Sequence, residues 1–195
     1  TYLPSVPRIF EKLYAAAMKM QDGASDDDKQ RFREAVKLGV EVRSRRQRGE
    51  DVPEEMAKAF EQADGQLFKR VRDLFGGQVR QAVTGAAPIA PEILEFFYAA
   101  GIPVLEGWGM TETTAIGTVS TLDEFKFGTV GKAVPGVEIR IAQEDGEILM
   151  RGPNLFREYW RNPEATAETI VDGWLHTGDV GELDDEGYLT ITGRK

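Results

Sequence analysis

Residues 78–112, QVRQAVTGAAPIAPEILEFFYAAGIPVLEGWGMTE, decide the fold of this chain. Val79–Val83 predicts a short strand that runs into a loop of small residues, Thr84–Pro88. Pro91 and Gly101 then flank an apolar segment. A proline in the first turn and a glycine just past the last turn are typical of a helix, so the segment between them is predicted to be helical.

A second strand is predicted at Ile102–Leu105, and it runs into a second loop, Glu106–Glu112. Two strands joined through a helix in this way are expected to be parallel. If they are neighbours, both loops leave the same carboxyl edge of the sheet, where open α/β sheets bind ligands. The pattern therefore predicts an α/β fold with a ligand site formed by the two loops.

The first 75 residues predict helices. Apolar side chains recur at spacings of three and four residues in two stretches. They are Ile9, Leu13, Ala16 or Ala17, and Met20 in the first stretch, and Met56, Phe60, Ala63, Leu67, Val71 and Leu74 in the second. The first stretch predicts a helix, and the second predicts a helix with one buried face that serves packing.

Two charged runs lie between these stretches. Ser25 followed by Asp26–Asp28 predicts a helix N-cap with acidic residues in the first turn. A metal site is the less common alternative for such a run. Arg43–Arg48 contains four arginines and predicts a solvated turn, with contact to the phosphates of a ligand as the alternative.

The chain from Gly128 onward predicts a β-rich part. Two hairpins are expected, with turns at Glu144–Gly146 and Asp184–Gly187. Between them a short helix is predicted to begin after Asn162, and Trp174–Asp179 is expected to be a loop.

Composition excludes several classes of function. The chain has 195 residues, a net charge of −9, one histidine and no cysteine. The lack of cysteine excludes disulfides and thiolate chemistry and fits a cytoplasmic location, and one histidine, His176, excludes multi-histidine metal sites. The acidic excess argues against nucleic acid as a partner. No apolar run approaches the roughly 20 residues of a membrane span, which leaves peripheral membrane contact open.

The second loop carries side chains that suit a nucleotide. Its glycines expose backbone N–H groups to an anion. Trp108 offers a flat face, Thr111 a hydroxyl donor and Glu112 an oxygen ligand for Mg²⁺. The alternative is a tight turn with Trp108 in the core and Glu112 in solvent. The spacing matches neither the dinucleotide-binding glycine fingerprint nor the phosphate loop of P-loop enzymes.

Five segments, in their order along the chain, resemble the motifs of the adenylate-forming superfamily. They are Thr84–Pro88, Glu106–Glu112, Gly146–Pro153, Gly173–Asp179 and Gly193–Lys195. The helical lead-in and the opening Tyr2–Arg8 most resemble the long-chain fatty-acyl-CoA synthetase branch. The resemblance implies part of a parallel-sheet domain with a helical lead-in (1–77), a strand–helix–strand piece (78–127) and a barrel-like β-rich piece (128–195).

The resemblance also implies a two-step reaction. A fatty acid carboxylate attacks the α-phosphorus of Mg-ATP to give acyl-AMP and pyrophosphate. The thiol of coenzyme A then displaces AMP and forms the thioester. ATP, Mg²⁺ and coenzyme A are therefore the expected cofactors and co-substrates.

Site residues follow from the motifs by resemblance. Gly85, Ala86, Ala87 and Pro88 would line the acyl and adenine pocket, and Glu106, Gly107 and Gly109 would shape the second loop. Trp108, where the family usually has tyrosine, would stack on adenine. Asp179 would accept the ribose hydroxyls, with Arg194 reaching the ribose or phosphate, and His176 would pack its loop.

Two residues carry the chemistry that the resemblance implies. Thr111 would bond the α-phosphate, and Glu112 would hold Mg²⁺. Both would stabilise the negative charge that develops at phosphorus.

Departures from the family pattern lie at the ends. The family's phosphate-gripping loop with its lysine is expected upstream of Thr1, and a small domain with the adenylating lysine is expected after Lys195. The chain is therefore expected to be a piece of a longer protein. By itself it is expected to bind nucleotide weakly and not to turn over. Residues 81–195 carry a net charge of −11, so a triphosphate there would need Mg²⁺ and cations from the missing parts.

Two alternatives stay open. Another adenylate-forming enzyme, an acyl-AMP ligase or a peptide-synthetase adenylation domain, would differ in its dependence on coenzyme A. A non-catalytic nucleotide- or acyl-binding module would not need the reactive side chains. The presence of Thr111, Glu112 and Asp179 argues against the module.

Overall fold

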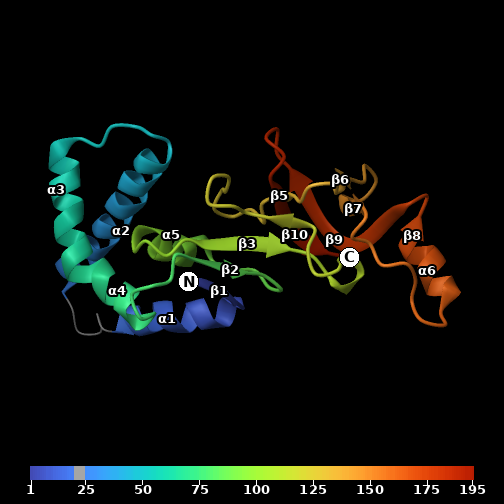
Figure 1. Ribbon diagram of the computed structural model, residues 1–195, viewed down its shortest axis with the longest axis horizontal. Coiled ribbons are helices and arrows are strands. Elements are labelled where there is room, and N and C mark those ends of the chain that lie inside the picture. Colours follow the sequence, from blue (N-terminus) through green and yellow to red (C-terminus); the bar gives the residue numbers. More distant parts are fainter. Residues whose placement is uncertain (20–24) are drawn as a thin grey trace. The chain divides into compact units, whose positions relative to one another are not determined.

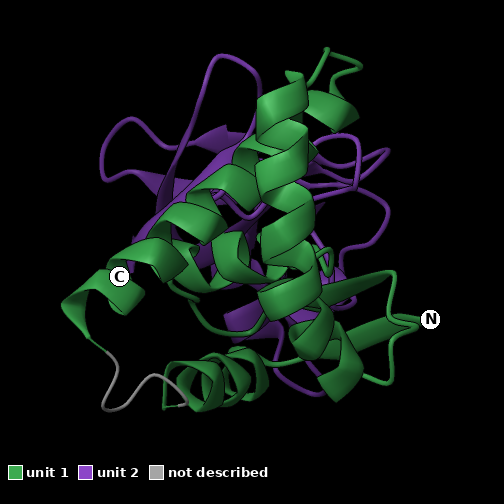
Figure 2. Cartoon of the chain, turned by 90° about the vertical axis from the view of Figure 1, so that its left-hand side faces the viewer, with its two compact units in different colours: residues 1–105 green, residues 106–195 purple. Residues whose placement is uncertain are grey.

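The computed structural model describes residues 1–19 and 25–195 (Figure 1). Met20, the last member of the first predicted apolar stretch, lies outside the described residues. The chain divides into two compact units, unit 1 (Thr1–Leu105) and unit 2 (Glu106–Lys195), which Figure 2 colours green and purple. The three segments expected from the sequence stay a prediction.

Unit 1 is mostly helical, as the first part of the sequence predicts. Its elements are β1 (Tyr2–Ser5), α1 (Pro7–Lys19), α2 (Asp26–Gln47), α3 (Glu54–Ala63), a π-helical turn (Asp64–Phe68), α4 (Lys69–Leu74), β2 (Gln81–Thr84), α5 (Pro91–Ala99) and the beginning of β3 (Val104–Trp108). β1 pairs in parallel with β2, and β2 is the neighbour of β3. The two predicted strands are therefore neighbours, whereas β1 was not predicted.

Helix α5 forms the centre of the packing in unit 1. Phe96 and Phe97 are both 1% exposed, and their rings meet edge to face with centroids 5.2 Å apart. Helix α2 approaches α5 at Gly39, where an added Cβ would lie only 2.7 Å from the Cβ of Ala99. Burying each large apolar side chain contributes about 1.5–3 kcal/mol, so α5 holds the surrounding helices.

The arginine run is helical, and the predicted turn is wrong. Arg43–Arg48 belongs to α2, which ends at Gln47, with Arg48 as its C-cap. Arginine is a good helix former, so the run extends the helix instead of ending it. The other end was predicted correctly, because Ser25 is the N-cap and its hydroxyl accepts the N–H of Asp28 at 3.1 Å.

The second apolar stretch departs from one helical face. The π-helical turn Asp64–Phe68 interrupts the run between α3 and α4. A π-turn adds one residue to the helical turn and rotates the residues that follow. Phe68 is consequently fully buried, whereas Leu74 is 62% exposed. The predicted burial of Leu74 is wrong.

Unit 2 is rich in strands. It contains the end of β3, a 3₁₀ turn (Thr111–Thr113), β4 (Thr118–Val119), β5 (Lys132–Ala133), β6 (Glu138–Ile141), β7 (Glu147–Arg151), α6 (Pro163–Thr169), β8 (Ile170–Val171), β9 (Trp174–Leu183) and β10 (Leu189–Arg194). A curled antiparallel sheet has the order β10-β9-β7-β6, with β8 also paired to β9 (Figure 1). Both predicted hairpins and the helix after Asn162 are confirmed. The α/β class with a β-rich second part is confirmed as well.

Two stretches predicted as loops are strands. Trp174–Asp179 begins β9, and Glu106–Trp108 ends β3. The letters His-Thr-Gly-Asp suggest a turn, and Gly178 does have a left-handed φ of +73°. The pairing of β9 with β7 and β10 nevertheless carries these residues through as a strand. No helix among the described residues combines the length and apolarity that a membrane span requires.

Candidate functional site

Trp108 and Asp179 meet inside unit 2. Trp108 ends β3, where it pairs with Thr118 of β4 and packs against the buried side chains of Met150 and Leu175. Its indole Nε1–H donates a hydrogen bond to Asp179 Oδ2 at 2.9 Å. The ring therefore both contacts the core and orients a carboxylate, a combination that neither sequence alternative included.

Asp179 faces Arg194 across two strands. The two residues are partners in the β9–β10 register, and Arg194 Nε lies 3.7 Å from Asp179 Oδ1. Asp179 is 16% exposed and Arg194 is 78% exposed, so this ion pair is weak and open to solvent. The carboxylate is held on one oxygen by Trp108, and its other oxygen can accept donors from a ligand.

A tight turn presents Thr111 and Glu112 beyond the end of β3. At Gly109 an added Cβ would lie 2.4 Å from the carbonyl oxygen of Ala115, so only glycine fits. The hydroxyl of Thr113 accepts the N–H of Met110 at 2.9 Å and donates to its carbonyl oxygen at 3.0 Å. These contacts fix the turn and leave the side chain of Thr111 exposed.

Glu112 has a partner that sequence reasoning missed. The hydroxyl of Tyr159 donates to Glu112 Oε1 at 2.7 Å, and the N–H of Phe156 donates to the Glu112 carbonyl at 2.8 Å. The hydrogen bond to Glu112, together with burial, raises the pKa of Tyr159. Tyr159 lies 47 residues after Glu112 in the chain. Its position close to Phe156, with which its ring packs in an irregular segment, is the one feature that distinguishes it.

The oxygen donors near Glu112 are compatible with Mg²⁺ if phosphate groups supply most of its ligands. Among residues 1–19 and 25–195, no three His, Cys, Asp or Glu side chains gather to hold a metal. Mg²⁺ commonly takes one or two protein carboxylates and completes its octahedron with phosphate oxygens and water. Glu112 keeps Oε2 for such a role while Tyr159 occupies Oε1, so the residues fit an ion held mainly by phosphates.

The predicted small-residue loop lies in unit 1. Thr84 is 1% exposed, and its hydroxyl has no hydrogen-bond partner among the described residues. Ala86 has a left-handed φ of 69°, which costs a non-glycine residue about 1–2 kcal/mol. Strain of this kind gathers at functional sites, and Ala86, Ala87 and Pro88 are exposed. That this loop and the unit 2 residues form one site stays a prediction.

Glu106 differs from the other predicted site residues. Its carbonyl accepts the N–H of Ser120 at 2.8 Å, which holds the strand pairing beside Gly107. Burial of its side chain raises the pKa of Glu106 to about 7. Within the described residues of unit 2, no cation pairs with the carboxyl group of Glu106, whereas Glu147 has Lys195.

A buried carboxylate network supports β9 beside Asp179. Glu147 is 4% exposed and accepts the Gly178 N–H at 2.8 Å and Lys195 Nζ at 3.1 Å. His176 Nδ1 lies 3.0 Å from Glu147 Oε2, so His176 packs a strand by this contact. Burial pushes the pKa of Glu147 up, but these hydrogen bonds outweigh it and the pKa is lowered. Sequence reasoning did not identify Glu147.

Known proteins similar to this chain share one kind of chemistry. A family model described as AMP-binding enzyme matches residues 1–160. The chain is 41% identical over 196 residues to the long-chain-fatty-acid–CoA ligase FadD15 of Mycobacterium bovis, covering 100% of this chain and 32% of the relative. It is 36% identical over 201 residues to the long-chain-fatty-acid–CoA ligase ACSBG2 of Xenopus laevis, covering 100% of this chain and 27% of the relative.

Solved structures give the same picture. A fatty acyl CoA synthetase of Mycobacterium tuberculosis superposes with a TM-score of 0.55 at 31% identity, covering 65% of this chain and 28% of that one. The o-succinylbenzoate coenzyme A synthetase of Bacillus subtilis in complex with AMP superposes with a TM-score of 0.54 at 34% identity, covering 60% of this chain and 26% of that one. The chain spans about a third of the length of the curated relatives it matches.

Proposed function

Because the chain belongs to the family of AMP-binding enzymes, we propose that it forms part of an ATP-dependent long-chain fatty acid–CoA ligase. The observation that carries the proposal is the hydrogen bond from the Trp108 indole to the Asp179 carboxylate. Trp108 itself lies three residues before Thr111. β3 and its loop thereby offer an aromatic face, a hydroxyl and a carboxylate, and β9 adds a second, oriented carboxylate. This set matches the base, ribose and phosphates of a nucleotide.

The nucleoside part would be bound by Trp108 and Asp179. The accessible part of the half-buried indole ring would stack on adenine. Asp179 Oδ1 would accept the ribose hydroxyls, while the indole N–H keeps Oδ2 and fixes the carboxylate. Arg194 is 78% exposed and would turn from Asp179 towards the ribose or phosphate. Fixed geometry of this kind lowers the entropy lost on binding.

Thr111 and Glu112 would act on the phosphates. The Thr111 hydroxyl would donate to an α-phosphate oxygen while the fatty acid oxygen bonds to phosphorus and pyrophosphate leaves. Glu112 would bind Mg²⁺ through Oε2, with Tyr159 holding Oε1 in place. When bound, Mg²⁺ would supply positive charge to the phosphate oxygens. In the second step the coenzyme A thiol would attack the acyl carbonyl carbon and AMP would leave.

The test is made on the full-length protein with ATP, coenzyme A and saturated fatty acids of increasing length. We expect AMP, pyrophosphate and an acyl-CoA thioester in equal amounts with long-chain acids. Acyl-AMP that forms and is not consumed by coenzyme A would indicate an acyl-AMP ligase instead. Activation of amino acids would indicate an adenylation domain, and no activation of any fatty acid would refute the ligase.

Variants of the site make the proposal residue-specific. Glu112→Gln should lower kcat about 100-fold, because an electrostatic partner of the transition state is lost. Tyr159→Phe should lower it about tenfold and raise the Mg²⁺ concentration needed, as expected for a residue that orients a metal ligand. Glu158→Gln, an exposed neighbour of Tyr159, is the matched control and should leave kcat unchanged.

The 195 residues alone are expected to show no ATP–pyrophosphate exchange, because the relatives are about three times longer. Measurable exchange by the isolated chain would refute this expectation. A cytoplasmic location, with contact to a membrane surface that supplies fatty acid, stays a prediction, as does the absence of a nucleic-acid partner.

A further inference from the structure

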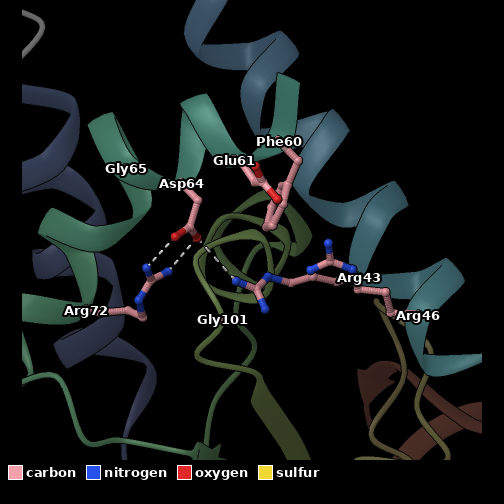
Figure 3. Close-up of a pocket in the computed structure, with 8 residues that line it drawn as sticks. All are labelled: Arg43, Arg46, Phe60, Glu61, Asp64, Gly65, Arg72 and Gly101. Atoms are coloured by element: carbon pink, nitrogen blue, oxygen red, sulfur yellow. Dashed lines mark hydrogen bonds and ion pairs between the residues drawn. The ribbon is translucent and has the colours of Figure 1, made fainter. Parts of the chain in front are cut away.

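A pocket of about 520 Å³ lies in unit 1 between α2, α3 and the end of α5, and none of its lining residues belongs to the predicted nucleotide site (Figure 3). Three arginines, one aromatic ring and two carboxylates line it. They are Arg43, Arg46, Arg72, Phe60, Glu61 and Asp64.

Arg43 and Arg72 are held in place by the end of α5. Arg43 Nε donates to the carbonyl of Ala99 at 2.8 Å, and an Arg72 terminal nitrogen donates to the carbonyl of Ala100 at 2.9 Å. Cations at a helix C-terminus satisfy its free carbonyls and its dipole. Both guanidinium groups are therefore in position before any ligand arrives.

One carboxylate serves both of these arginines. Asp64 receives two hydrogen bonds from Arg72, at 2.8 and 2.6 Å, and Arg43 lies 3.6 Å from Asp64 Oδ1. Figure 3 shows Asp64 between the two guanidinium groups. The hydrogen bonds from Arg72 hold the pKa of Asp64 below its usual value, so Asp64 stays ionised. Arg72 is fully paired, whereas Arg43 is only partly neutralised.

Arg46 has no direct ion-pair partner within the described part of the chain, and Asp64 attracts it only from a distance. The guanidinium groups of Arg43 and Arg46 lie 5.3 and 5.2 Å from the centre of the Phe60 ring. No hydrogen bond or ion pair joins the guanidinium of Arg46 to another residue of 1–19 or 25–195, and its contact there is the Phe60 ring. With three arginines against Asp64 and the exposed Glu61, the lining carries one net positive charge.

We propose that this pocket binds a phosphate group. Arginine carries five N–H donors in a planar fork that matches phosphate oxygens, and Arg46 has all five free of protein partners. Arg43 adds its terminal nitrogens beside Asp64, over Gly101, where an added Cβ would lie 2.7 Å from the guanidinium. A volume of 520 Å³ falls within the range of small-molecule sites. The proposal does not rest on the proposed ligase function.

Binding is tested on the full-length protein by calorimetric titration at constant ionic strength. Inorganic phosphate, pyrophosphate and AMP are the probes, and they distinguish a free oxyanion from a nucleotide phosphate. Arg46→Gln should lower the affinity for the anion that binds about tenfold, as expected for loss of one charge-assisted hydrogen bond. Arg48→Gln removes the same charge from the same helix end outside the pocket and should change the affinity less than twofold.

A second variant tests the sign of the effect. Glu61→Gln removes an exposed carboxylate from the lining and should strengthen binding about threefold. Binding of inorganic phosphate that survives Arg46→Gln but is lost in Asp179→Asn belongs to unit 2 and overturns the proposal. Equal losses in Arg46→Gln and Arg48→Gln, weaker binding in Glu61→Gln, or no saturable binding of any probe would also overturn it.

Discussion

Asp64 in unit 1 and Glu147 in unit 2 are both carboxylates shared by distant cationic or N–H donors. Asp64 joins α4 and α2 through Arg72 and Arg43, and Glu147 joins β7 to β9 and Lys195. The side chain of Asp64 is 27% exposed and that of Glu147 is 6% exposed. Because water competes less for the buried carboxylate, the same kind of contact is expected to matter more in unit 2.

Both carboxylates respond to pH in the same direction. The pKa of Asp64 is lowered, first by its hydrogen bonds from Arg72, and that of Glu147 is lowered although burial opposes the shift. A lowered pKa in the folded state gives stability that is present above the unfolded pKa. That stability is lost as the pH falls through the folded pKa, so both units should weaken in acid.

The largest effect is expected at Glu147. Glu147→Gln leaves Lys195 and His176 facing an amide in a buried place, and should lower the free energy of unfolding by about 3 kcal/mol. Urea unfolding at neutral pH measures it. Glu144→Gln, in the exposed turn of the same hairpin, should change the free energy by less than about 0.5 kcal/mol. A near-zero effect at Glu147 would show that burial adds nothing to this contact.

Glu106 shows the effect of burial on a carboxyl group that has no cationic partner among the described residues of unit 2. Its pKa is raised to about 7 by burial. A raised pKa gives stability that is full below the unfolded pKa of 4.5 and is lost as the pH rises through 7. Glu106→Gln should therefore add about 2 kcal/mol to the free energy of unfolding at about pH 8 and nothing near pH 4. Urea unfolding across this range, with the exposed Glu168→Gln as control, checks it, and a gain in acid instead would contradict the sign.

Asp64 should give a smaller effect. Asp64→Asn keeps one acceptor for Arg72 and loses the charge that both arginines share, so about 1 kcal/mol of unfolding free energy should be lost after solvent screening. Asp73→Asn breaks the exposed pair with Lys69 on the same helix and serves as the control, with less than about 0.5 kcal/mol expected. Thermal or urea unfolding measures both, and equal losses would remove the special role of Asp64.

The smallest expected effect is a difference between Asp64 and Glu147 in how salt changes the stability lost on substitution. Raising the ionic strength from about 0.05 to about 0.5 M shortens the screening length severalfold. The penalty of Asp64→Asn should fall by about half, whereas that of Glu147→Gln should stay within error. Parallel urea titrations in the two salt concentrations make the comparison. A larger salt effect at Glu147 would reverse the proposed ranking.

The sequence predicts an element correctly where neighbouring residues in the chain make the contacts that stabilise it. Ser25 and Pro91 set helix starts through contacts with their own first turn, and both were located from the sequence. The predicted loop at Trp174–Asp179 is wrong because the strand partner of β9 on β7 lies far away in the sequence. The predicted turn at Arg43–Arg48 is wrong because arginine favours a helix in spite of its charge.

The candidate site was predictable only in part. Trp108, Thr111, Glu112 and Asp179 were identified from the residue types and from the resemblance of their motifs. Their contacts were not, because a hydrogen bond such as that of Tyr159 with Glu112 depends on how an irregular segment packs. The same holds for Glu147, whose neighbours along the chain give no sign that it is buried.

The hydrogen bond between Trp108 and Asp179 joins residues 71 positions apart. Closing a loop of that length has an entropy cost that grows with the logarithm of its length, and contacts of large sequence separation slow folding. The oriented carboxylate therefore exists only once β9 has joined the sheet. During synthesis the side chains proposed to bind the nucleotide are consequently assembled only after Asp179 has emerged. An opening of β9, which pairs with β7, β8 and β10, would dismantle the proposed site together with the curled sheet.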